Sequence, residues 1–98
     1  MLLSCGDALI DFLPAKSADG RGAFLPVVGG SCLNVAIGMA RLGAPAGFVG
    51  GISTDLLGQM ISDYAQSSQV DLRYATRGPT HKARVCADHR RRAAIYLL

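Results

Sequence analysis

The sequence has little of what marks a membrane, secreted or metal-binding protein. No run approaches the roughly 18 apolar residues that a transmembrane helix needs, and the first residues lack the basic and apolar regions of a signal peptide. Three cysteines without a CxxC pair indicate neither a disulfide framework nor a zinc site. His81 and His89 have no acidic cluster beside them. We therefore expect a reduced, cytoplasmic protein with no metal ligands of its own.

Several catalytic motifs are also missing. There is no GxxxxGK[ST] loop, no GxGxxG after the first predicted strand and no GxSxG, which excludes P-loop NTPases, classical dinucleotide folds and α/β-hydrolases. The glycines occur instead as pairs at 29–30 and 50–51. Ser31 and Cys32 have no identifiable base, so Cys32 is interpreted as a small core residue.

Glu and Trp are absent, and the charges are unevenly placed. Residues 1–72 carry three basic residues against six Asp, a net charge of −3, whereas residues 73–98 have a net charge of +6. A basic segment of this kind can bind nucleic acid, but bare charge clusters are weak motifs and few aromatic residues accompany this one. Nucleic-acid binding is therefore the last-ranked hypothesis.

Alternating short apolar runs and helical patterns predict an α/β fold. Residues 2–13 read as a buried strand, or one that bulges at Gly6 and resumes, ended by Pro14. Residues 15–22 read as a loop or hairpin tip. Residues 23–28, interrupted by Pro26, read as an edge strand or an extended arm.

Two helices and two more strands follow in the prediction. The first helix begins at Ser31 as N-cap and stops at Gly43, and with the strand at 46–52 it completes a βαβ crossover with a parallel strand pair. A cap within 53–55 starts a second helix, in which Gly58 indicates a close approach. The alternation in 70–76 predicts a strand.

Three features are left to carry chemistry: Asp11, the pair Gly29-Gly30, and Asn34. Glycines let a backbone approach a ligand closely, Asp accepts hydrogen bonds, and Asn both donates and accepts. Together they suit vicinal hydroxyl groups, so these residues weakly predict a polyol site. The alternative is that Asp11 is solvated and Asn34 caps its own helix turn. Asp7 is expected to meet water at a strand end.

The chain resembles the N-terminus of the ribokinase-like (PfkB) sugar kinases, in the style of bacterial fructokinases. The resemblance rests on GDALIDFLP, on VVGGSCLNVAIGMARLGAPAGFVGGISTDLLGQMI and on VDLRYATR, within residues 2–80. It includes Asp-x-x-Gly at 55–58. Cys32, where the family usually has Gly, Ala or Pro, and Ser53, where many members have Gly, depart from the pattern.

The resemblance implies the N-terminal part of a layered α/β fold with a small β lid, over residues 1–80. It implies transfer of the ATP γ-phosphate to a sugar hydroxyl, with Mg²⁺. Asp11, Gly29, Gly30 and Asn34 would bind the sugar, and segments 12–16 and 22–28 would form a lid that often makes a homodimer contact. Lid closure would exclude water.

The family's catalytic Asp lies in a Gly-Ala-Gly-Asp motif near the C-terminus, and no such motif occurs here. The sequence therefore predicts a truncated kinase that is inactive alone, without catalytic, nucleotide-binding or metal-binding residues. Residues 81–98 read as a basic tail, interpreted as the end of a truncated product or as out-of-frame sequence. The alternative is a non-catalytic module that binds a sugar or a partner.

Overall fold

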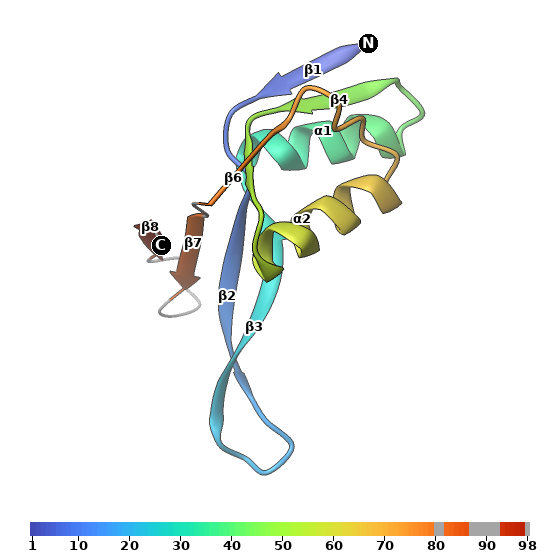
Figure 1. Ribbon diagram of the computed structural model, residues 1–98. Coiled ribbons are helices and arrows are strands. Elements are labelled where there is room, and N and C mark those ends of the chain that lie inside the picture. Colours follow the sequence, from blue (N-terminus) through green and yellow to red (C-terminus); the bar gives the residue numbers. More distant parts are fainter. Residues whose placement is uncertain (80–81, 87–92, 98) are drawn as a thin grey trace.

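The computed structural model describes residues 1–79, and the backbone of 82–86 and 93–97 (Figure 1). The strands are β1 (Leu2–Cys5), β2 (Leu9–Lys16), β3 (Gly22–Gly29), β4 (Ala46–Val49), β5 (Gly51–Ser53), β6 (Thr76–Gly78), β7 (Lys82–Cys86) and β8 (Ala93–Leu97), and the helices are α1 (Ser31–Arg41) and α2 (Leu56–Ser67). The predicted α/β class is confirmed. Neither helix is long and apolar enough to cross a bilayer.

The layered part of the molecule is a β–α–β unit. Strands β1 and β4 pair in parallel, from Leu2 opposite Ala46 to Cys5 opposite Val49, and α1 packs on both. The predicted parallel pair and crossover are therefore present. Between β1 and α1 the chain departs into a long hairpin, β2–β3, which projects away from the layers in Figure 1.

The hairpin is paired along its whole length, from Leu9 opposite Gly29 to Lys16 opposite Gly22. The prediction that Pro14 ends the first strand was wrong, because β2 continues to Lys16. In an antiparallel hairpin, opposite residues alternate between hydrogen-bonded and non-hydrogen-bonded pairs. The pairs Pro14–Phe24 and Phe12–Pro26 are two residues apart along β2, so both are of the same kind. Because proline has no N–H, these are the pairs whose N–H groups point away from the hairpin partner.

Two other strand predictions need correction. The run 46–52 divides at Gly50 because β4 pairs with β1 while β5 pairs with β6 in another sheet. Within the predicted strand 70–76 only an isolated bridge, Gly47 to Asp71, and Thr76, the first residue of β6, are in β structure. The Asp71 carboxylate accepts from the Arg73 backbone N–H at 2.9 Å and pairs with its Nε at 2.8 Å, which bends the chain into a turn.

The core joins the layers to the base of the hairpin. Its largest fully buried apolar side chains come from β2, α1, β4, β5 and α2: Ile10, Leu33, Phe48, Ile52 and Ile61. Helix α2 packs on β5 and also contacts β2 and β3. The hairpin base is therefore held by the same core as the helices, while the outer half of the hairpin extends beyond it.

Strands β7 and β8 extend the hairpin sheet to the order β3-β2-β7-β8. β7 runs parallel to β2, with Asp11 in register with Arg84, and β8 runs antiparallel to β7. The sequence of this region showed no strand pattern, yet its backbone forms two strands. The tail prediction for 81–98 falls partly outside the described residues, as do His81, His89 and the three Arg at 90–92.

Candidate functional site

The hairpin β2–β3 leaves the β–α–β unit after β1 and returns to it at the start of α1, and these two points lie together. Gly30, which follows β3, has a φ of +103°, and a Cβ there would lie 2.5 Å from the Asp7 carbonyl oxygen. The same oxygen accepts from the Leu33 N–H at 3.3 Å. The backbone before β2 and the first turn of α1 are thus packed against each other, which positions the hairpin over the start of the helix.

Asp11 lies on the hairpin near this junction. Successive side chains alternate along a strand, so Asp11 faces away from Ile10, which is fully buried in the core. Asp11 is half-buried, and its carboxylate lies over the buried Gly29, where an added Cβ would overlap Oδ2 and lie 3.3 Å from Cγ. The contact is diagonal across the hairpin, since Leu9 is the register partner of Gly29.

Helix α1 starts at Ser31, with Gly30 as its N-cap. The prediction of Ser31 as N-cap was therefore wrong, because the positive φ of Gly30 makes the turn one residue earlier. The Asn34 N–H donates to the Gly30 carbonyl at 2.9 Å. Asn34 is exposed, and within the part of the chain that the structure describes its side-chain amide makes no hydrogen bond, so it does not cap its own helix turn.

The four predicted site residues form two contacts. The Asp11 carboxylate lies over Gly29, and Asn34 is joined through its backbone to Gly30, the next residue along the chain. The arrangement offers a carboxylate acceptor on one side and the N-terminus of a helix with an exposed amide on the other. Such groups can accept from and donate to the hydroxyls of one small polar ligand.

No pattern in the sequence indicated how β1 holds the start of α1. The Ser4 hydroxyl donates to the Cys32 carbonyl at 2.6 Å, and the Cys32 side chain lies against Gly6, whose added Cβ would overlap Sγ. Cys32 is half-buried and packs against the core without being one of its fully buried residues, so its interpretation as a small core residue is only partly met. Asp7 is exposed, as predicted for a strand end.

The Asp-x-x-Gly segment at 55–58 has a structural role. Asp55 is the N-cap of α2; its carboxylate accepts from the Gly58 N–H at 2.9 Å and from the Ser53 hydroxyl at 2.6 Å. A Cβ at Gly58 would overlap the Ser53 carbonyl. The predicted cap and close approach are both present, and they fix α2 on β5.

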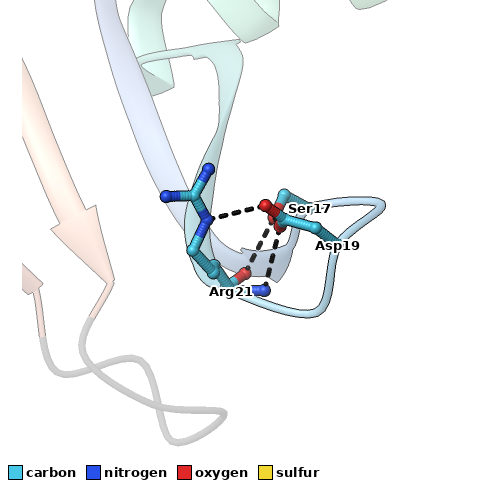
Figure 2. Close-up of polar contacts among 3 residues, drawn as sticks. All are labelled: Ser17, Asp19 and Arg21. Atoms are coloured by element: carbon cyan, nitrogen blue, oxygen red, sulfur yellow. Dashed lines mark hydrogen bonds and ion pairs between the residues drawn. The ribbon is translucent and has the colours of Figure 1, made fainter.

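The hairpin turn has a polar network of its own, shown in Figure 2. The Ser17 hydroxyl donates to Asp19, and Arg21 contacts the same carboxylate through its backbone N–H at 3.3 Å and its Nε at 2.7 Å. The Ser17 hydroxyl and then the Arg21 backbone N–H hold the pKa of Asp19 below its ordinary value. The network is fully exposed, so it orders the turn and adds little to global stability.

An open groove of about 600 Å³ lies between β3 and α2, and none of the four predicted site residues lines it. It is lined by Pro26, Val27, Val28, Met60, Asp63, Tyr64 and Ser67. Across residues 1–79 and the two further strands that the structure describes, no three His, Cys, Asp or Glu side chains cluster as metal ligands.

Comparisons with known proteins agree on one family. A family model described as pfkB family carbohydrate kinase matches residues 1–96, so the match extends through β7 and into β8. A fructokinase of Rhizobium leguminosarum bv. trifolii is 42% identical over 71 residues, which are 72% of this chain and 22% of that protein. The chain thus spans about a fifth of this relative.

Solved structures agree with this match. A fructokinase from Xylella fastidiosa superposes with a TM-score of 0.82 at 30% identity, covering 98% of this chain and 31% of that one. A second structure of fructokinase from the same organism, with bound ATP, has a TM-score of 0.76 at 27% identity and covers 98% of this chain and 32% of that one.

Proposed function

The chain belongs to the pfkB family of carbohydrate kinases, and we propose that its described residues form the sugar-binding part of a fructokinase-like phosphotransferase. The observation that carries the proposal is the Asp11 carboxylate over Gly29, beside the glycine turn that opens α1. Two curated relatives named fructokinase, at 42% and 39% identity, make fructose the first sugar to test.

The proposed site binds the sugar through complementary hydrogen bonds. The Asp11 carboxylate accepts from neighbouring hydroxyl groups, and the Asn34 amide both donates and accepts. Gly29 and Gly30 have no side chains, so the sugar can approach the backbone at the start of α1, where the helix dipole favours sugar oxygen atoms. These residues bind and orient the sugar; none is proposed to move a proton.

ATP is the proposed phosphoryl donor and Mg²⁺ the proposed metal, as in the family; ATP supplies the γ-phosphoryl group. One related fructokinase was solved with ATP, which supports the nucleotide. The described residues contain no group of three or more His, Cys, Asp or Glu side chains that could hold a metal ion, so we assign Mg²⁺ to none of them. We assign none of them to ATP either. We propose that these 98 residues bind sugar and do not transfer a phosphoryl group by themselves, since positioning and charge stabilisation supply most of this catalysis.

The hairpin is the proposed lid and the proposed contact between two copies of the chain. It carries four exposed large apolar side chains: Leu13, Phe24, Leu25 and Val27. Leu13 and Leu25 are register partners, so they share the face of the hairpin that also bears Asp11. A second copy packing there would remove this apolar surface from water.

Two measurements on the 98-residue chain test this function. Fructose is expected to raise the unfolding temperature of the wild-type chain, because a ligand that binds only the folded state stabilises it. Asp11→Ala is expected to remove that shift, and Asp63→Ala, an exposed Asp on α2, to keep it. A coupled assay with ATP, Mg²⁺ and fructose is expected to show no turnover; turnover that Asp11→Ala abolishes would contradict the proposed inactivity.

The second candidate is a non-catalytic module that binds a partner rather than a sugar. The exposed apolar hairpin is the observation that favours it. It predicts no thermal shift with fructose or other neutral sugars, and association that depends on the hairpin side chains. The fructose-dependent shift therefore separates the two candidates.

A further inference from the structure

The two adjacent glycines at the end of β3 are required for different physical reasons. Gly30 has a φ of +103°, and its added Cβ would meet backbone atoms, the Asp7 carbonyl oxygen at 2.5 Å and the Ala8 Cα at 3.1 Å. A side chain at Gly30 is therefore excluded by the backbone turn itself. Gly29 lies within a paired strand, and it is not among the positive-φ glycines of the described chain.

The space beside Gly29 is filled by one side chain. An added Cβ would overlap the Asp11 Oδ2 and lie 3.3 Å from Cγ, while the next atom, Leu9 Cδ1, is at an ordinary contact distance of 3.6 Å. No other atom of residue 11, including its Cβ, is nearer than that. What a side chain at 29 would displace is thus the carboxylate alone.

We propose that Gly29 is a positioning residue for the Asp11 carboxylate, so that a side chain at position 29 weakens sugar binding by displacing Asp11. The inference rests on the proposed sugar site. A side chain at 29 forces the Asp11 Oδ2 to move, so the acceptor atoms no longer lie where they do over Gly29. A hydrogen bond that depends on a charged acceptor loses most of its strength when the geometry is lost.

The chain offers two matched controls. Gly22 lies on the same strand as Gly29, and a Cβ there would meet nothing within 4 Å. Gly22→Ala therefore reports the effect of adding a methyl group to β3 alone. Ile61, buried in α2, belongs to the core and not to the site. Ile61→Val therefore reports the effect of a general loss of stability on sugar affinity.

The test is a double-mutant cycle on the 98-residue chain with Gly29→Ala, Asp11→Ala and both together, measured by thermal unfolding and by calorimetric titration with fructose. Gly29→Ala alone is expected to lower the unfolding temperature and weaken fructose binding at least about tenfold. When Gly29→Ala is added to the Asp11→Ala variant, the further change in unfolding temperature is expected to be no larger than the change caused by Gly22→Ala. Ile61→Val is expected to lower the unfolding temperature while fructose affinity stays within about twofold.

Two results would overturn the inference. One is an equal loss of unfolding temperature when Gly29→Ala is made in the wild-type chain and in the Asp11→Ala variant. The other is wild-type fructose affinity in Gly29→Ala. If the wild-type chain does not bind fructose, the proposed function fails on its own. Unequal temperature changes across the cycle would then still support the positioning of Asp11 by Gly29, and equal changes would refute it.

Discussion

The Asp7 carbonyl oxygen accepts a hydrogen bond from the Leu33 N–H at 3.3 Å, across the point where the hairpin leaves and rejoins the layers. Gly30 lies at this junction, with room for no side chain beside the same oxygen. The base of the hairpin is therefore held by backbone contacts to the first turn of α1. Asp11, in the first half of β2, is carried on that fixed base.

Two glycines inside helices are expected to respond oppositely to Ala. Ala has a higher helix propensity than Gly by up to about 1 kcal/mol. At Gly38 a Cβ would meet nothing within 4 Å, so Gly38→Ala should stabilise the fold by about this amount. At Gly58 it would overlap the Ser53 carbonyl, and overpacking costs about 1–3 kcal/mol, so Gly58→Ala should destabilise. Urea unfolding measures both; equal stabilisation by the two would contradict the packing at Gly58.

Asp55→Ala is expected to destabilise the fold by about 0.5–2 kcal/mol, because α2 loses its N-cap. The carboxylate accepts from the Gly58 N–H and the Ser53 hydroxyl, and Ser53 is buried, so its hydroxyl would be left without that acceptor. Asp63→Ala, on the exposed face of the same helix, should change stability by no more than about 0.5 kcal/mol. Equal urea midpoints for the two variants would refute the capping role.

Asp19 is expected to titrate below its ordinary pKa of 3.8. A carboxyl group with a lowered pKa in the fold contributes its stabilisation fully above the unfolded value, and loses it as the pH falls through the folded value. The hairpin turn should therefore loosen only in acid below about pH 4. Carboxyl ¹³C NMR should show the Asp19 pKa rising in Ser17→Ala, with no change in Ser67→Ala. An unchanged pKa in Ser17→Ala would contradict the network in Figure 2.

The hairpin is expected to mediate self-association. Leu25→Asp places a charge on the exposed apolar face, which should convert a dimer to a monomer in sedimentation velocity at tens of micromolar chain. Leu42→Asp is the matched control, since Leu42 is also exposed but lies at the end of α1. A monomeric wild-type chain, or a Leu25→Asp variant that still dimerises, would exclude the hairpin as the contact.

Local patterns predicted much of the fold. The edge strand containing Pro26 and both helices follow from glycine and proline positions and from helical periodicity. The prediction of a single buried strand over 2–13, with or without a bulge at Gly6, was wrong, because β1 and β2 belong to different sheets and β1 is largely exposed. Pro14 misled the prediction because a proline ends a strand only where its N–H would be needed. In the hairpin register its nitrogen points away from β3, and register is a property of two strands and their turn rather than of one.

The residue types of the site could be predicted from the sequence, but the geometry of the site could not. The close approach of the Asp11 carboxylate to Gly29 depends on the pairing of Leu9 with Gly29, which a turn at 17–21 produces and which no single strand encodes. The sulfur of Cys32 lies against Gly6, a residue far away in the sequence, and this contact left no pattern there. The assignment of Asp11, Gly29, Gly30 and Asn34 to a sugar stays a prediction from resemblance.

The most direct test of the account is a calorimetric titration of fructose into the wild-type chain and into Asp11→Asn. Asn nearly preserves the shape of Asp and removes the charged acceptor over Gly29, so the fold should be retained. The account predicts saturable binding to the wild-type chain and at least about tenfold weaker binding to Asp11→Asn. Equal affinity in the two chains, or no binding to the wild-type chain, would contradict it.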